Sequence, residues 1–255
     1  MMRLFHVSDV HFGREDPTAI AWFEAVVKAE QPDAVIMTGD LTMRARRREF
    51  AAGLGWLQRL GVPVTVEVGN HDLPYFNPID RFFRPYQRMG AIKRLVEVPL
   101  DLPGVAIVPL VTTARAQWRW NWSKGKVSKG ALARALALLA EVPKGKLVFI
   151  ACHHPLIEGA TSASARTHRG ADALAALAEA GAHAVLTGHV HDPFDITHVI
   201  DGQTIRMIGA GTLSERTRTT PPSFNEIRVD GAQFDVVVRA MDSAPDEVLV
   251  RERAE

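Results

Sequence analysis

The chain has 255 residues, of which 47% are hydrophobic and 23% are charged, and its net charge at pH 7 is +1. This composition is ordinary for a water-soluble globular protein, and the length allows one α/β domain with a large core. No apolar run approaches the ~20 residues of a membrane span, and the near-zero net charge gives no overall sign of binding to nucleic acid or to an anionic membrane. The single cysteine, Cys152, excludes an internal disulfide and fits a reducing compartment, so we expect a cytoplasmic protein.

The first three quarters of the chain predict alternating strands and helices. Apolar, β-branched runs indicate strands, and apolar residues at helical spacing indicate the helices between them. The predicted strands cover residues 3–7, 34–37, 62–68, 105–111, 146–151 and 184–187. The predicted helices cover residues 16–30, 43–60, 129–140 and 171–180, and a loop at residues 73–94 contains one more helix.

From residue 196 onward the period changes to the alternation of antiparallel strands. These strands are predicted at residues 196–200, 204–208, 224–229 and 234–238, with hairpin turns at Asp201-Gly202 and Asp230-Gly231. An alternating α/β part followed by an antiparallel part indicates two packed sheets flanked by helices. Because the sequence has no repeat and no linker, we expect a single domain over residues 1–241. The highly charged residues 242–255 are expected to form a tail or a terminal strand.

Five short polar motifs follow one another along the chain, and almost every one comes directly after an apolar, β-branched run. They are Asp9-Val10-His11, Gly39-Asp40, Gly69-Asn70-His71-Asp72, His153-His154-Pro155 and Gly188-His189-Val190-His191. Functional groups gather beyond the carboxyl ends of strands in an α/β sheet, so we expect these side chains to meet. Carboxylates, an amide oxygen and imidazoles suit Mn²⁺, Fe or Zn²⁺ better than Ca²⁺, and the lack of thiolates argues against a structural zinc site.

The ordered motifs closely resemble the calcineurin-like metallophosphoesterase superfamily, over roughly residues 3–238, and within it the small bacterial cyclic-nucleotide phosphodiesterases. The resemblance implies a four-layer α/β/β/α sandwich of two mixed sheets flanked by helices. It also implies two divalent metal ions. The implied ligands are Asp9, His11 and His191 for one ion, Asn70, His153 and His189 for the other, and Asp40 as the bridge.

The same resemblance implies hydrolysis of a phosphoric ester, by in-line attack of a hydroxide that two metal ions share. His71 matches the family's non-ligand histidine, which contacts the phosphate or protonates the leaving oxygen, and Asp72 would orient that loop. We therefore expect a metal-dependent phosphodiesterase for small phosphodiesters, with cyclic nucleotides among the candidates. Two alternatives stay open: a phosphomonoesterase or nucleotidase with the same metal residues, and a non-catalytic scaffold that metals stabilise.

Two parts of the sequence are candidates for substrate binding. Arg46, in an arginine-rich stretch after Asp40, and Arg216, in a later loop, have the guanidinium group that suits phosphate oxygens. Trp118 and Trp120 alternate with polar residues, so an extended segment would turn their indoles to one side, where they could stack on a nucleobase. The alternatives are a solvated helix face for Arg46 and an edge strand packed on the core for the tryptophans.

Overall fold

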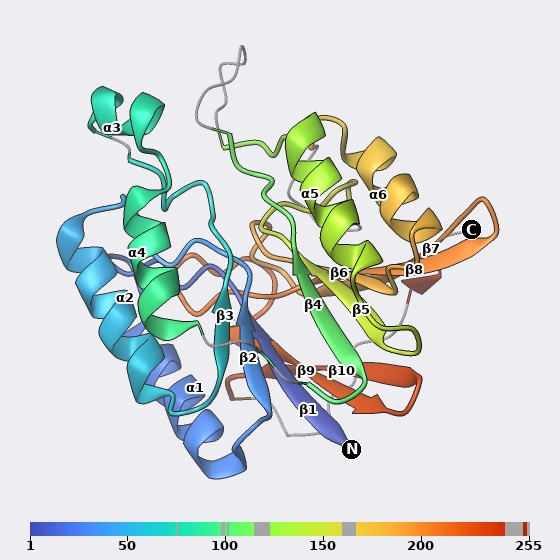
Figure 1. The fold of residues 1–255 in the computed structure, drawn as a ribbon. Coiled ribbons are helices and arrows are strands. Elements are labelled where there is room, and N and C mark those ends of the chain that lie inside the picture. The colour runs from blue at the N-terminus through green and yellow to red at the C-terminus, as the bar shows by residue number, and fades with distance from the viewer. Residues whose placement is uncertain are drawn as a thin grey trace.

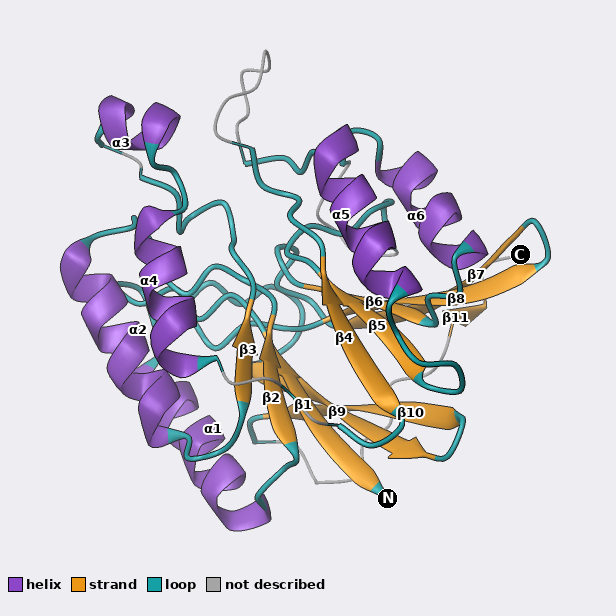
Figure 2. Ribbon diagram, viewed as in Figure 1, coloured by secondary structure: helices purple, strands orange, loops and turns teal. Residues whose placement is uncertain are grey.

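Two β-sheets lie face to face between layers of helices (Figures 1 and 2). The computed structural model describes residues 1–74, 76–97, 100, 102–114, 123–159, 167–242 and 252–253. The four-layer α/β/β/α sandwich that the sequence predicted is thereby confirmed. None of the helices within these residues is long and apolar enough to cross a membrane.

The first sheet has the strand order β10-β9-β1-β2-β3. Its parallel part consists of β1 (Met2–Val7), β2 (Ala34–Met37) and β3 (Val64–Val66). Strands β9 (Ser223–Asp230) and β10 (Gln233–Ala240) extend it in antiparallel register. The end of the chain therefore returns to pair with its beginning.

The second sheet has the strand order β11-β7-β8-β6-β5-β4. Its strands are β4 (Val105–Pro109), β5 (Leu147–Ala151), β6 (Ala184–Thr187), β7 (Phe194–Ile200), β8 (Gln203–Gly209) and β11 (Glu252–Arg253). Strands β4, β5, β6 and β8 are parallel, whereas β7 forms an antiparallel hairpin with β8. Within the segment 242–255, for which the sequence left a tail or a strand open, β11 pairs with β7 in parallel.

Three apolar clusters hold the four layers together. Helices α1 (Pro17–Glu30), α2 (Arg47–Arg59) and α4 (Gln87–Val96) pack on the outer face of the first sheet. Helices α5 (Lys129–Ala140) and α6 (Gly170–Glu179) pack on the second sheet. Between the sheets, alternate residues of facing strands, including Leu4 and Phe149, form the third cluster.

Two of the differences from the sequence prediction have local reasons. Helix α2 begins at Arg47 rather than at residue 43, because Ala45 has the left-handed φ of 51° and Arg46 is extended. The loop at residues 73–94 contains α3 (Pro78–Phe83) and the start of α4 instead of one helix. The residue before a proline disfavours helical geometry, and Arg84, which precedes Pro85, ends α3.

Candidate metal centre

The candidate metal-binding residues all follow strands, at the end of the molecule where the parallel strands of both sheets finish. Asp9 and His11 come after β1, Asp40 after β2, and Asn70 after β3. From the second sheet, His153 follows β5, and His189 and His191 follow β6. The two sheets therefore contribute to one site, as the positions of the motifs predicted.

Five of these residues have left-handed backbone geometry, although none is a glycine. The φ angles are 55° at Asp9, 52° at His11, 53° at Asp40, 72° at His189 and 64° at His191. Such geometry costs of order 1 kcal/mol or more for a residue with a Cβ, and it concentrates at functional sites. Backbone hydrogen bonds between neighbouring loops hold it, including Asp9 N to Gly39 O at 3.0 Å and His11 N to Asp40 O at 3.0 Å.

Glycines in the motifs allow the loops to approach the carboxylates closely. A Cβ on Gly188 would lie 1.8 Å from Oγ of Ser8 and 2.4 Å from Oδ2 of Asp9. A Cβ on Gly69 would lie 2.0 Å from Oδ1 of Asp40. Each of these positions therefore requires glycine for a steric reason, which explains two of the glycines in the motifs.

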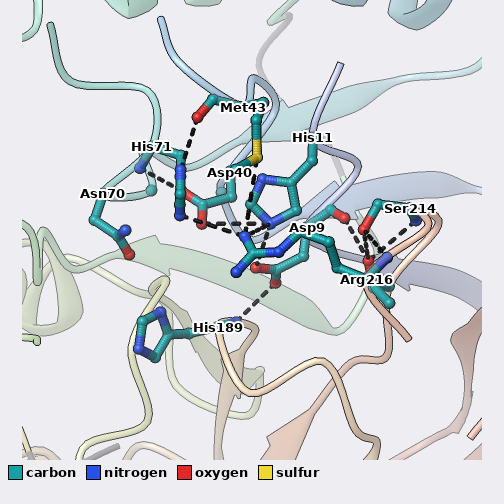
Figure 3. A network of polar contacts seen from close by, with 12 residues as sticks. Asp9, His11, Asp40, Met43, Asn70, His71, His189, Ser214 and Arg216 are labelled. Carbon is teal, nitrogen blue, oxygen red and sulfur yellow. Dashed lines mark hydrogen bonds and ion pairs between the residues drawn. The ribbon is translucent and has the colours of Figure 1, made fainter. Parts of the chain in front are cut away.

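Asp9, His11 and His191 form the first group of donor atoms. The Nε2 atoms of His11 and His191 lie 3.1 Å apart, and Oδ1 of Asp9 lies 3.5 Å and 3.1 Å from them, respectively. The other carboxylate oxygen of Asp9 accepts a hydrogen bond of 2.7 Å from the backbone N–H of His189. Figure 3 shows Asp9, His11, His71 and Asp40 around the guanidinium of Arg216, with the backbone of His189 bonded to Asp9.

Asp40, Asn70, His153 and His189 form the second group. Nε2 of His153 lies 3.1 Å from Oδ1 of Asn70 and 3.3 Å from Oδ2 of Asp40, and the ring of His189 is 5.2 Å from that of His153. Oδ2 of Asp40 also lies 3.8 Å from Nε2 of His11. Asp40 is therefore the carboxylate between the two groups.

The ionisation of these groups reflects their burial and their mutual contacts. Burial alone raises the pKa of Asp9 and of Asp40, but the surrounding histidines bring both below the ordinary range of an aspartate. Burial lowers the pKa of His153, yet Asp40 more than reverses this and raises it to about 9. At His189 burial prevails, together with the neighbouring His153, and the pKa falls to about 3.

The donor atoms fit metal ions. Nδ1 of His153 donates to the carbonyl of Thr38 at 2.8 Å, and Nδ1 of His191 donates to the carbonyl of Arg216 at 2.8 Å, so in both residues Nε2 is the atom that faces the site. Oδ1 of Asp9 is buried with no hydrogen-bond partner among the described residues. An oxygen and several imidazole nitrogens that converge in this way form a donor set for a cation, and the mixed O/N set suits Mn²⁺, Fe or Zn²⁺.

His71 and Asp72 lie beside the donor groups and have different surroundings. Nδ1 of His71 is 2.7 Å from the carbonyl oxygen of Met43, which turns Nε2 toward the site. Asp72 is 1% exposed, and its oxygens accept hydrogen bonds from the backbone of Leu41, Thr42 and Gly69. Asp72 thus ties the loop of Asp40 to the loop of Asn70. Burial and the nearby Asp40 raise its pKa to about 6.

A cavity of about 260 Å³ opens above the donor groups. Its lining includes Asp40, His71 and His189, together with Ser123, Arg216 and Arg218. Nη1 of Arg216 lies 3.4 Å from Nε2 of His11 and 3.4 Å from Nε2 of His71. The exposed guanidinium therefore stands at the entrance to the candidate metal centre, where an anionic group of a ligand would meet it.

The other residues proposed from the sequence have different positions. Arg46 does not line this cavity; its guanidinium lies 5.8 Å from the ring centre of Phe76, on the outer side of the loop. Trp118 and Trp120 lie outside the described residues. His154 lies within reach of His189, but its Nε2 donates to the carbonyl of Ser123 and its Nδ1 bonds to Thr112, so both ring nitrogens are engaged.

Sequence reasoning did not find the backbone groups that orient the imidazoles. The carbonyls of Thr38, Met43 and Arg216 hold His153, His71 and His191, respectively. Every residue has a carbonyl, so no residue type could indicate these positions. Ser123 also lines the cavity, and no residue pattern around it indicates that position.

Comparisons with known proteins agree with this geometry. The family model described as calcineurin-like phosphoesterase matches residues 2–193. A comparison with curated protein sequences gives no match. Among solved structures, a dimetal phosphatase from Danio rerio is 15% identical with a TM-score of 0.65, over 93% of this chain and 98% of that chain.

Two further structures are similar in fold. A purple acid phosphatase from seeds of yellow lupin (Lupinus luteus) is 13% identical with a TM-score of 0.62, over 98% of this chain and 52% of that chain. The phosphopantetheinyl hydrolase from Mycobacterium tuberculosis is 19% identical with a TM-score of 0.51, over 82% of this chain and 89% of that chain. At such low identities these similarities concern the fold.

Proposed function

Because this chain belongs to the calcineurin-like phosphoesterase family, we propose that it is a dinuclear, metal-dependent phosphodiesterase acting on small phosphodiesters. Cyclic nucleotides are among the candidate substrates. The observation that carries this proposal is the convergence of donor atoms from both sheets on the carboxylate of Asp40. A set of this kind serves no evident structural purpose, since it places buried acceptors against one another.

We assign the donor groups to two metal ions, Mn, Fe or Zn. Asp40 would hold both ions. The further ligands would be Asp9, His11 and His191 for one ion and Asn70, His153 and His189 for the other. When bound, the ions supply positive charge that activates water as a nucleophile and neutralises the phosphoryl oxygens. The hydrogen bonds from His153 and His191 to backbone carbonyls keep those imidazoles in one tautomer and orientation.

His71 and Arg216 act on the substrate. Nδ1 of His71 donates to the carbonyl of Met43, which turns Nε2 toward the site. In the imidazolium form both ring nitrogens carry a proton, and the proton on Nε2 passes to the leaving alkoxide oxygen as the ester P–O bond breaks. Arg216 binds a non-bridging phosphoryl oxygen, since its guanidinium lies 3.4 Å from His71 Nε2 at the entrance. Asp72 contributes indirectly, by fixing the loops that carry Asp40 and His71.

A phosphomonoesterase or nucleotidase is the second candidate function. Two of the proteins with similar folds are named phosphatases, which favours this reading. The ordered motifs, by contrast, most resemble those of cyclic-nucleotide phosphodiesterases. The two activities share the same metal ligands, so relative rates on the two ester classes are needed to separate them.

The test is hydrolysis of bis(p-nitrophenyl) phosphate beside p-nitrophenyl phosphate, after chelation and after return of Mn²⁺, Fe²⁺ or Zn²⁺. We expect cleavage that requires metal and strongly favours the diester. A preference for the monoester would replace the proposal by the phosphomonoesterase. If the metal-loaded protein cleaves neither ester and no cyclic nucleotide, the non-catalytic scaffold is the remaining interpretation.

A further inference from the structure

The helix α3 exposes apolar side chains at the edge of the molecule. Figure 1 shows α3 standing away from the two sheets, beyond the end of α4. Ile79 is 70% exposed and Phe83 is 81% exposed, and the neighbouring Phe82 and Tyr86 are also at the surface. Single exposed apolar residues are common on protein surfaces and need no explanation. Several of them together on one short protruding helix, by contrast, mark an interaction surface.

The same region is strongly basic. Residues 43–49 contain four arginines and one glutamate, and residues 76–97 contain five lysines and arginines and two acidic residues, whereas the whole chain has a net charge of only +1. The exposed Arg47, Arg84 and Arg94 form no ion pair with any described residue. The small net charge of the chain therefore conceals one local concentration of uncompensated positive charge.

A groove beside α3 has basic and apolar lining of its own; Arg84, which follows Phe83 in the sequence, lines it, whereas Ile79 and Phe83 do not. It has a volume of about 600 Å³ and lies between α2 and α4. Phe50, Leu54 and Ile92 contribute apolar lining, and Arg47 and Arg84 also line it. We call Arg47, Ile79, Phe83, Arg84 and this groove the basic-apolar face.

We propose that the basic-apolar face docks the protein on an anionic lipid bilayer. Ile79 and Phe83 would enter the boundary between headgroups and acyl chains, while Arg47 and Arg84 would bind the lipid phosphates. A second copy of the chain fits poorly, because two such faces would bring like charges together. A nucleic acid could stack a base on Phe83, but it would leave the aliphatic Ile79, which is 70% exposed, without an apolar partner.

The proposal is independent of the metal centre, and its test needs no catalysis. The full chain is floated with vesicles of phosphatidylcholine alone and with vesicles that also contain phosphatidylglycerol, in about 0.1 M salt. We expect binding to the anionic vesicles to exceed binding to the zwitterionic ones about tenfold, and to weaken as salt rises. Equal or no binding to the two kinds of vesicle would overturn the proposal.

Variants locate the contact. Ile79→Ser with Phe83→Ser should weaken binding at least tenfold, and Arg47→Gln with Arg84→Gln about fivefold per charge removed. Val199→Ser is the matched control, because Val199 is 72% exposed on β7, on the other sheet, and should bind as the unaltered protein does. If the Ile79/Phe83 and the Arg47/Arg84 variants bind the anionic vesicles as well as the unaltered protein does, the basic-apolar face is not the membrane contact. A change only in self-association of the Ile79/Phe83 variant, without a change in vesicle binding, would also refute it and indicate a contact between copies.

Discussion

The Nε2 atoms of His11 and His191 lie 3.1 Å apart, although the two residues are 180 positions apart in the sequence. His191 donates its other ring nitrogen to the carbonyl of Arg216, so its Nε2 offers a lone pair toward His11. Two lone pairs at this distance repel each other unless a cation or a proton lies between them. Together with Oδ1 of Asp9, which lies 3.1 Å from Nε2 of His191 and has no hydrogen-bond partner among the described residues, the two nitrogens form a donor set for a metal ion.

His191→Ala should remove most of the stabilisation that metal gives to the fold. A ligand that binds the native state alone raises the free energy of unfolding by about 2.7 kcal/mol at a hundredfold excess over its Kd. We expect Mn²⁺ or Zn²⁺ to raise the melting temperature of the chelated protein, and the variant to lose much of that increase. His168→Ala, at an exposed histidine outside the centre, is the control and should keep the increase. An equal metal response in both variants would contradict the assignment of His191.

His71→Asn should separate catalysis from metal binding. The side chain contacts Met43 and Arg216 and is not among the proposed ligands, so the variant should keep two metal ions and its melting temperature. Loss of the proton donor should lower kcat for an ester with a poor leaving group by about 10²–10⁴, and less for p-nitrophenyl esters, whose leaving group needs little protonation. Metal analysis and steady-state kinetics check this. An unchanged kcat on both kinds of ester would exclude His71 as the acid.

Asp72→Ala should destabilise the protein by about 3 kcal/mol, because buried backbone N–H groups of Leu41, Thr42 and Gly69 would lose their acceptor. Asp72→Asn should also destabilise, since an amide has only one oxygen to accept from donors that now meet two. The measurements are urea unfolding and metal affinity, and we expect both to decline together. Full stability with normal metal affinity in the alanine variant would show that the loops are held by other contacts.

The strand ends could be predicted from sequence, but their geometry could not. Asp9 and Asp40 were placed together because apolar runs precede them and parallel strands finish at one edge. Their left-handed backbones were not foreseen, because φ above zero is rare for aspartate and depends on hydrogen bonds from neighbouring loops. Similarly, the split of residues 73–94 into two helices depends on Arg84-Pro85, which the helical periodicity alone did not reveal.

Glu226→Gln should make the free energy of unfolding less dependent on pH in the acid range. The carboxylate is 1% exposed and lies 2.8–2.9 Å from donor nitrogens of Arg3, Arg228 and Arg239. Burial raises its pKa, but the arginines outweigh this and lower it from 4.5 to about 2. A depressed pKa stabilises the fold fully above pH 4.5, and this contribution is lost as the pH falls toward 2.

The variant removes that contribution, so it should be less stable at pH 7 by roughly 2–3 kcal/mol and should lose less stability between pH 4.5 and 2. Urea unfolding at a series of pH values measures the difference. Glu215→Gln is the control, because that carboxylate pairs with Arg14 at the surface and should matter little. Parallel curves for the Glu226 variant and the unaltered protein would contradict the expected pKa.

The residues that would contact the substrate were harder to predict from the sequence than the metal-binding residues. Arg46 and Arg216 were both candidates from the sequence, yet Arg216 stands at the cavity and Arg46 lies over Phe76. Which arginine reaches the site depends on the direction of its loop, and no residue pattern encodes that direction locally. The two ring nitrogens of His154 are likewise engaged by Thr112 and Ser123, partners that are far away in sequence.

Anomalous X-ray diffraction from crystals of the Mn²⁺-loaded protein tests the central claim most directly. We predict two anomalous peaks about 3.5–4 Å apart, with Asp40 contacting both. One peak should contact Asp9, His11 and His191, and the other Asn70, His153 and His189. A single peak, or peaks held by other side chains such as His154, would contradict the dinuclear centre.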